Sequence, residues 1–126
     1  MNFKWGDYLQ LANELCSNRS DTLSEAYDRT IISRSYYAVY NAAAKVIEKR
    51  EGTIDWSSVP NSHQYVINKF LKSEDESEKE IGQQLDMLKK ERKRADYREN
   101  NKNINRNNAT LQYSMAKQAF AAIKAL

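Results

Sequence analysis

Residues 33–43, SRSYYAVYNAA, stand in the middle of the longest helical pattern in the chain, which we predict to cover about residues 22–51. Apolar and small residues recur along this pattern at the spacing of one helix face. They are Leu23, Ala26, Tyr27, Thr30, Ile31, Tyr37, Ala38, Asn41, Ala44 and Ile47. The helix is expected to stop at Gly52, a residue typical of a C-terminal cap. Arg34 lies on or beside the same face, which is an unusual place for a charge.

A second segment, residues 92–97 (RKRADY), also places an arginine on a face that should be buried. It belongs to a helical pattern at about residues 77–98, and Arg92 is in line with the apolar positions of that pattern. These positions are Ile81, Leu85, Leu88 and Ala95. An unpaired guanidinium is costly to bury. We therefore predict a structural ion-pair cluster of Arg34, Arg92 and Asp96, with Asp96 one turn after Arg92. The alternative is a wet cleft in which the arginines bind an anion.

The rest of the chain also has the pattern of long helices joined by few turns. Further helices are predicted at about residues 3–17, 62–72 and 109–125. The 126 residues include only three glycines and one proline, so turn signals are sparse. We expect one domain, residues 1–126, that forms an all-α, antiparallel up-and-down bundle of four to five helices. Residues 53–61 are expected to be an irregular connection, and the asparagine-rich residues 100–108 a mobile loop.

Composition narrows the function classes. Apolar residues make up 40% of the chain and charged residues 29%, which is typical of a soluble globular protein. No run of about eighteen apolar residues is present, so no membrane span is expected. The first residues lack the apolar block of a signal peptide, which favours the cytoplasm. Because the chain has one cysteine, Cys16, and one histidine, His63, we predict no disulfide, no metal site and no cofactor.

The charge is unevenly distributed along the chain. Residues 72–80 contain two lysines and five acidic residues, whereas residues 89–98 contain six basic and two acidic residues. Such a basic run is commonly the solvated face of a helix. It also creates a local positive field that suits a phosphate, a nucleotide or an RNA backbone. The candidate anion-binding residues are Arg34, Lys89, Arg92, Lys93, Arg94 and Tyr97.

The tyrosines allow two interpretations. Tyr36, Tyr37 and Tyr40 on the long helix, together with Tyr97, would suit a platform for stacking bases. Tyrosines in helices more often bury their rings and tether their hydroxyls, and this core role is the interpretation that we favour. The apolar and aromatic residues of the 22–51 and 77–98 helices exceed what a monomer of this size needs, which predicts a homodimer.

Three motifs occur in a definite order. They are the RSYYA and NAA segments within residues 34–43, the pair Ser62-His63 at the start of the next helix, and Leu85, Leu88 and Arg92 leading to residues 95–97 (ADY). This ordered combination spans most of residues 20–98 and resembles the HEPN family. The resemblance implies a bundle of four or five helices from a prokaryotic toxin–antitoxin or defence system, often encoded beside a minimal nucleotidyltransferase. It also implies frequent dimerisation and, in many members, metal-independent ribonuclease activity.

The chain departs from the family at the catalytic motif, an arginine followed four to six residues later by a histidine. Arg92 is followed by Tyr97 where that histidine would stand, and His63 has no arginine four to six residues before it. A phenol with an unperturbed pKa of about 10 is a poor base at neutral pH. In the family, a tyrosine near this motif accepts a nucleotidyl group, so the resemblance also makes the Tyr97 hydroxyl a candidate acceptor.

We therefore expect a binding module that acts with a partner nucleotidyltransferase, RNA or a nucleotide and that lacks ribonuclease activity of its own. One alternative is an RNA endonuclease toxin with a degenerate, metal-independent site built from Arg92, Tyr97 and His63. A second alternative is a structural module whose role is dimerisation.

Overall fold

The structure is a computed structural model that describes residues 3–18, 21–97 and 104–126. These residues form five α-helices and two short 3₁₀ helices and contain no strand. In chain order the elements are α1 (Gly6–Ser17), η1 (Asp21–Leu23), α2 (Ser24–Glu51), η2 (Trp56–Ser58), α3 (Ser62–Leu71), α4 (Glu76–Tyr97) and α5 (Arg106–Lys124). The predicted all-α class and the number of helices are confirmed. Within these ranges, no helix combines the length and apolar character that a membrane crossing would require.

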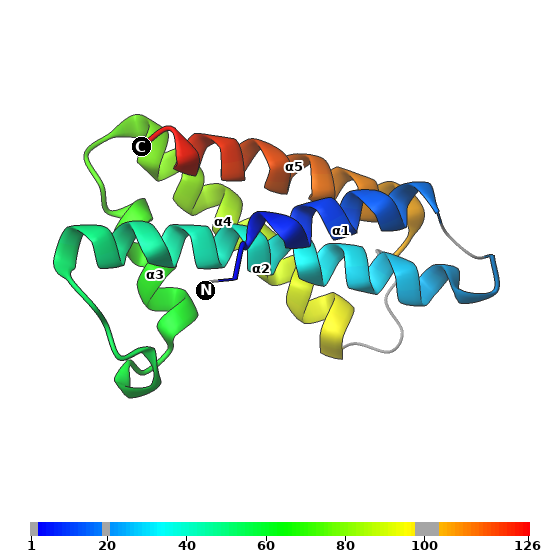
Figure 1. The fold of residues 1–126 in the computed structure, drawn as a ribbon, viewed down its shortest axis with the longest axis horizontal. Coiled ribbons are helices and arrows are strands. Elements are labelled where there is room, and N and C mark those ends of the chain that lie inside the picture. The colour runs from blue at the N-terminus through cyan, green and yellow to red at the C-terminus, as the bar shows by residue number, and fades with distance from the viewer. Residues whose placement is uncertain (1–2, 19–20, 98–103) are drawn as a thin grey trace.

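The long helix α2 is the centre of the molecule, and each of the other four α-helices contacts it. Figure 1 shows α1 and α5 lying lengthwise along α2, with α4 inclined across it. The helix ends at Glu51, as predicted, because Gly52 adopts a φ of 93° and donates its N–H to the carbonyl of Glu48. A side chain at residue 52 would strain that backbone. The sequence therefore marks the end of α2 with a single glycine.

The predicted buried face of α2 is wrong in part. Leu23 is 57% exposed because it lies in η1, before α2 begins, and Ala26 and Thr30 are exposed as well. The buried residues continue further round the helix, where fully buried positions include Ile32, Ser35, Val39 and Ala43. A helix that four others cover is buried around most of its circumference, so spacing alone cannot identify a single buried stripe.

The arrangement of the helices is less regular than a simple bundle. The short α3 packs mainly on α4, and α4 is inclined to α2. The strict up-and-down order therefore stays a prediction. α1 begins at Gly6 rather than at residue 3. α5 begins earlier than predicted, at Arg106, because the Asn105 side chain accepts the N–H of Asn108 and caps the helix. Of the predicted asparagine-rich loop, residues 100–103 lie outside the described residues.

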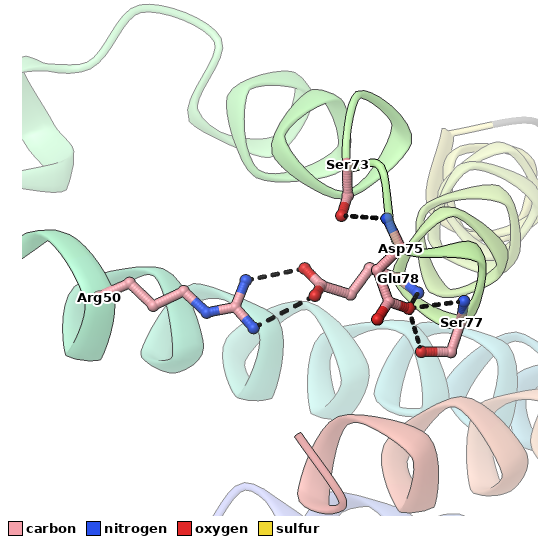
Figure 2. A network of polar contacts seen from close by, with 5 residues as sticks. All are labelled: Arg50, Ser73, Asp75, Ser77 and Glu78. Carbon is pink, nitrogen blue, oxygen red and sulfur yellow. Dashed lines mark hydrogen bonds and ion pairs between the residues drawn. The ribbon is translucent and has the colours of Figure 1, made fainter.

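A polar network holds the start of α4 against the end of α2 (Figure 2). The Asp75 carboxylate accepts the backbone N–H groups of Ser77 and Glu78, and Ser73 Oγ accepts the N–H of Asp75. The Ser77 hydroxyl also donates to the Asp75 carboxylate. This bond first, and then the two backbone N–H groups, hold the pKa of Asp75 below its usual value. Glu78 in the first turn forms an ion pair with Arg50 of α2 at 2.7 Å. The network therefore fixes both the N-terminus of α4 and its position on α2.

The contact between α3 and α4 depends on Gly82, which is buried in α4. A Cβ atom at this position would lie 2.7 Å from the backbone nitrogen of Leu71 and 3.0 Å from the Leu71 side chain. A backbone atom cannot rotate out of the way as the end of a side chain can. Glycine is therefore required for the close approach of the two helices.

We predict that Gly82→Ala destabilises the protein by about 1 to 2 kcal/mol. A clash with a backbone atom should cost roughly 2–3 kcal/mol, the upper part of the range for overpacking, and the gain in helix propensity offsets about 1 kcal/mol of it. Urea unfolding followed by circular dichroism measures the effect. The control is Gln83→Ala at the next, exposed position, which should change the free energy of unfolding by less than about 0.5 kcal/mol. An unchanged or more stable Gly82→Ala protein would contradict the packing argument.

Candidate anion-binding site

Arg92 of α4 is buried, with 6% of its surface exposed, as its place on the apolar face predicts. Its guanidinium carbon lies 5.3 Å from the ring centroids of both Tyr36 and Tyr37 on α2, and 5.8 Å from the ring centroid of Tyr97. A cation at these distances from aromatic rings is attracted by their quadrupoles, and more strongly where water is excluded. Three tyrosine rings therefore stabilise the buried charge.

The predicted ion pair between Arg92 and Asp96 is present but long. Arg92 Nη1 lies 3.7 Å from Asp96 Oδ2 and 3.5 Å from the Tyr97 hydroxyl oxygen. The Asp96 side chain is 28% exposed and also accepts a hydrogen bond from Ser33 Oγ. Arg92 Nε is buried and has no hydrogen-bond partner among the described residues. The guanidinium is therefore only partly neutralised and keeps hydrogen-bonding capacity.

Arg34 does not join this cluster, so the predicted group of three charges is wrong in that member. Its guanidinium carbon lies 4.8 Å from the ring centroid of Tyr8 on α1. Successive residues of an α-helix are about 100° apart, and the neighbouring residue Ser33 is the one that reaches Asp96. Arg34 instead ties α2 to α1. Its predicted role as an anion ligand stays a prediction, apart from the Arg92 cluster.

His63 comes to the Arg92 cluster from α3. Asn61, in a left-handed conformation with a φ of 52°, precedes the helix, and asparagine tolerates this conformation better than most residues. The turn places His63 in the first turn of α3, where its ring stacks on Tyr40 at a centroid distance of 4.0 Å. His63 Nδ1 lies 2.5 Å from the Tyr36 hydroxyl oxygen. The imidazole is therefore fixed by two tyrosines of α2.

The surroundings keep His63 neutral. Burial lowers its pKa to about 4, and the nearby charges of Arg92, Lys89 and Lys93 act in the same direction. Burial raises the pKa of Tyr36 well above its usual value, although the charge of Arg92 opposes this shift. Tyr36 thus keeps its proton. In the tautomer that carries its proton on Nε2, the imidazole accepts the hydrogen bond of the Tyr36 hydroxyl at Nδ1 and presents a hydrogen-bond donor at Nε2.

Two lysines of α4 complete the positive surroundings. Lys89 Nζ donates a hydrogen bond to Gln64 Oε1 at 3.1 Å, and burial lowers the pKa of Lys89. Lys93 lies one turn further along α4 and is exposed. We call the following group the Arg92 site: Tyr36, Tyr37, His63, Lys89, Arg92, Lys93, Asp96 and Tyr97. It gathers residues of α2, α3 and α4 that are far apart in the sequence.

Arg94, another predicted anion ligand, lies outside the Arg92 site. It forms an ion pair with Glu91, whose other carboxylate oxygen accepts a hydrogen bond from Asn108 of α5. Arg94 therefore belongs to the contact between α4 and α5. Lys90 of the same basic run is paired with Asp86 at 3.0 Å. The described part of the basic run is thus divided: Lys89, Arg92 and Lys93 lie at the site, and Lys90 and Arg94 lie outside it.

The favoured core role of the tyrosines is confirmed for Tyr36 and Tyr40, which are buried. Sequence reasoning did not assign them to the surroundings of Arg92 and His63. The signal that could have suggested it is the coincidence of an arginine on a buried face with adjacent tyrosines on the helix packed against it. In the described residues, no group of three or more histidine, cysteine or acidic side chains could hold a metal ion.

Comparison with known proteins adds no relative from which a role could be transferred, since no family model, curated protein or solved structure matches the chain.

We predict that acid destabilises the protein through His63. Its pKa is about 4 in the folded state and 6.5 as the ordinary value, so the unfolded chain binds the proton first as the pH falls. The destabilisation that His63 causes is absent above about pH 6.5 and grows as the pH falls to about 4. Between pH 7 and pH 5, the wild type should lose about 1 kcal/mol more stability than His63→Gln, a value reduced for the solvent screening of this half-buried ring. Urea unfolding at both pH values measures this, and equal losses in the two proteins would contradict the assignment.

Proposed function

We propose that this chain is an antiparallel helical bundle of the HEPN type that binds the phosphate groups of RNA, or of a nucleotide, at the Arg92 site. In this proposal it is a cytoplasmic component of a toxin–antitoxin or defence pair, its partner protein is a minimal nucleotidyltransferase, and it cuts no RNA itself. The resemblance to the family rests on the motif residues. In support of the proposal, residues from all three motifs meet around Arg92, since Tyr36, His63 and Asp96 belong to different motifs.

The state of the Arg92 guanidinium is the observation that carries the proposal. The group is buried, its nearest carboxylate is 3.7 Å away, and its Nε has no partner among the described residues. Lys89 and Lys93 add positive charge near it, and both contribute to the lowered pKa of His63. A phosphate supplies the missing negative charge and accepts several N–H donors at once. Nε2–H of His63 is a further donor that a phosphate oxygen could accept.

The same arrangement argues against ribonuclease activity. A general base must offer an unprotonated atom to the 2′-hydroxyl of RNA, and its ideal pKa lies near the working pH. Nδ1 of His63 is hydrogen bonded to the Tyr36 hydroxyl, and burial lowers the pKa of the imidazole to about 4, which makes it a weak base at neutral pH. Tyr97 stands in the position of the family histidine and is 71% exposed, but it lacks the ring nitrogen with which a histidine accepts a proton. The endonuclease alternative, with Arg92, Tyr97 and His63 as the site, thus lacks an efficient base.

Tyr97 has a second role in the proposal, as the acceptor of a nucleotidyl group from the partner enzyme. Its ring is the most exposed of the large apolar and aromatic side chains in the described residues. Its hydroxyl oxygen lies 3.5 Å from Arg92 Nη1. A nucleotidyl group attached there would bring its own phosphate to the guanidinium. Modification and ligand binding would then compete for one site.

Homodimerisation is a further part of the proposal, and a purely structural dimerisation module is the alternative to a binding module. The apolar surface of α2 was one reason for expecting a dimer, but that surface is covered inside the monomer. The exposed large hydrophobic side chains of α4 are Met87, which is 51% exposed, and Tyr97. A dimer contact would therefore involve α4 rather than α2.

We predict that the protein binds short unstructured RNA weakly and that binding falls steeply between 50 and 200 mM salt. Lys93→Gln should weaken binding and reduce the slope of log K against log salt by about 0.7, the expected change for one contact to a single strand. Fluorescence anisotropy with labelled RNA measures both quantities. Lys90→Gln is the matched control, because Lys90 lies on the same helix but is paired with Asp86. Equal losses in the two variants would contradict a localised site.

We predict that the purified protein does not cleave RNA at neutral pH, because the lowered pKa of His63 makes it a weak base and Tyr97 stands in place of the family histidine. Tyr97→His restores a group that titrates near pH 7, and this variant should gain measurable cleavage or toxicity in cells if Arg92 is positioned as in the family. Gel analysis of labelled RNA is the assay. Robust cleavage by the wild type that Arg92→Ala abolishes would overturn the non-catalytic proposal and favour the endonuclease.

A further inference from the structure

A groove that shares no residue with the Arg92 site lies at another part of the bundle. Its volume is about 840 Å³, and its walls come from the start of α1, the C-terminal half of α2 and the end of α5. Ala42, Val46 and Ile123 give it an aliphatic surface, and Trp5 and Phe120 add aromatic rings. A groove of this size and composition is suited to an apolar occupant.

The groove continues the path of α1 along the bundle. α1 contacts both α2 and α5, and its twelve residues span about 18 Å, whereas the 28 residues of α2 span about 42 Å. In Figure 1, α1 starts near the middle of α2 and leaves the C-terminal half of α2 and the end of α5 without a helix on that side. The groove residues 42 to 50 of α2 extend over about 12 Å, or two helical turns. A short helix would fit beyond the N-terminal end of α1.

The charges around the groove select a negative occupant. Five basic residues line it, and Asp7 is the only acidic one. The basic residues are Lys4, Lys45, Lys49, Arg50 and Lys124. Arg50 is paired with Glu78, but the ion pairs in the described part of the chain leave Lys4, Lys45 and Lys49 without a carboxylate. Acidic residues flanking an apolar stripe would be complementary to this rim.

The polar groups of the groove distinguish a peptide from a nucleotide. The side chains that line it include no serine, threonine, asparagine, glutamine, tyrosine or histidine. Apart from the cations and Asp7, the indole N–H of Trp5 is the one polar side-chain group in the lining. Amide and hydroxyl side chains commonly read the edge of a base, and this lining holds none of them, only the cations, Asp7 and the indole. An aliphatic stripe on a helix needs none.

We propose that this groove docks an acidic amphipathic helix of a partner protein, about two to three turns long, in line with α1. Its apolar side chains, spaced three and four residues apart, contact Val46, Phe120 and Ile123. Its acidic side chains pair with Lys4, Lys45 and Lys49. The docking surface is independent of anion binding at the Arg92 site, because the two sites have no residue in common.

The test uses the full chain with Trp56→Phe, so that Trp5 is the single tryptophan. The probe is a synthetic amphipathic peptide with leucines at helical spacing and glutamates elsewhere, and its control is the same peptide with lysines in place of the glutamates. The acidic peptide should shift Trp5 fluorescence to the blue and perturb amide NMR signals of groove residues. Lys45→Glu combined with Lys49→Glu should weaken its binding at least tenfold.

The control for this charge reversal is Lys72→Glu combined with Lys117→Glu, which makes the same change at exposed positions outside the groove. Equal effects of the two double variants would overturn the proposal, as would equal binding of the two peptides or no perturbation by the acidic one. Perturbation of the groove by ATP but not by the acidic peptide would identify a nucleotide site instead. The double variant Lys45→Glu with Lys49→Glu should change RNA affinity much less than Lys93→Gln does. RNA binding therefore tests the Arg92 site separately from peptide binding at the groove.

Discussion

Burial of the Arg92 guanidinium against tyrosine rings is the constraint on which the rest of the structure depends. A charge in the interface between α2 and α4 must be stabilised, and an exposed carboxylate at 3.7 Å does so only partly. The rings of Tyr36 and Tyr37 add a further part of the stabilisation. Tyr36 then orients His63 and so joins α3 to the same centre. One buried cation thus links three helices and adds to the effect of burial in lowering the pKa of the only histidine.

Much of the fold was predictable because helix periodicity is a local property. The helices at 22–51 and 77–98 were located to within about two residues, and Gly52 marked one end. The buried face of α2 was predicted less well, because contacts with four neighbouring helices bury it on nearly all sides. The start of α5 also differed, because the Asn105 cap lies within an asparagine-rich stretch whose composition favours a loop.

The candidate site was predictable where it depends on one helix. Arg92, Asp96 and Tyr97 belong to α4, and helical spacing brings them together. The contributions of Tyr36 and His63 could not be derived in the same way, because they depend on how α2 and α3 pack against α4. Arg34 shows the limit of such reasoning. It was predicted to join Asp96, but the neighbouring residue Ser33, about 100° away around the helix, makes that contact, and Arg34 lies over Tyr8 instead.

The burial of His63 beside three cations has a consequence for regulation. Histidines commonly make binding sites sensitive to pH near neutrality. Here the only histidine has a pKa of about 4, so the charge that it contributes does not change within the range of a living cell. In the proposed function, a site of an arginine and two lysines around a neutral imidazole would respond to ionic strength and to competing anions. Its occupancy would therefore be governed by how much ligand is present, and by covalent change at Tyr97, rather than by acidity.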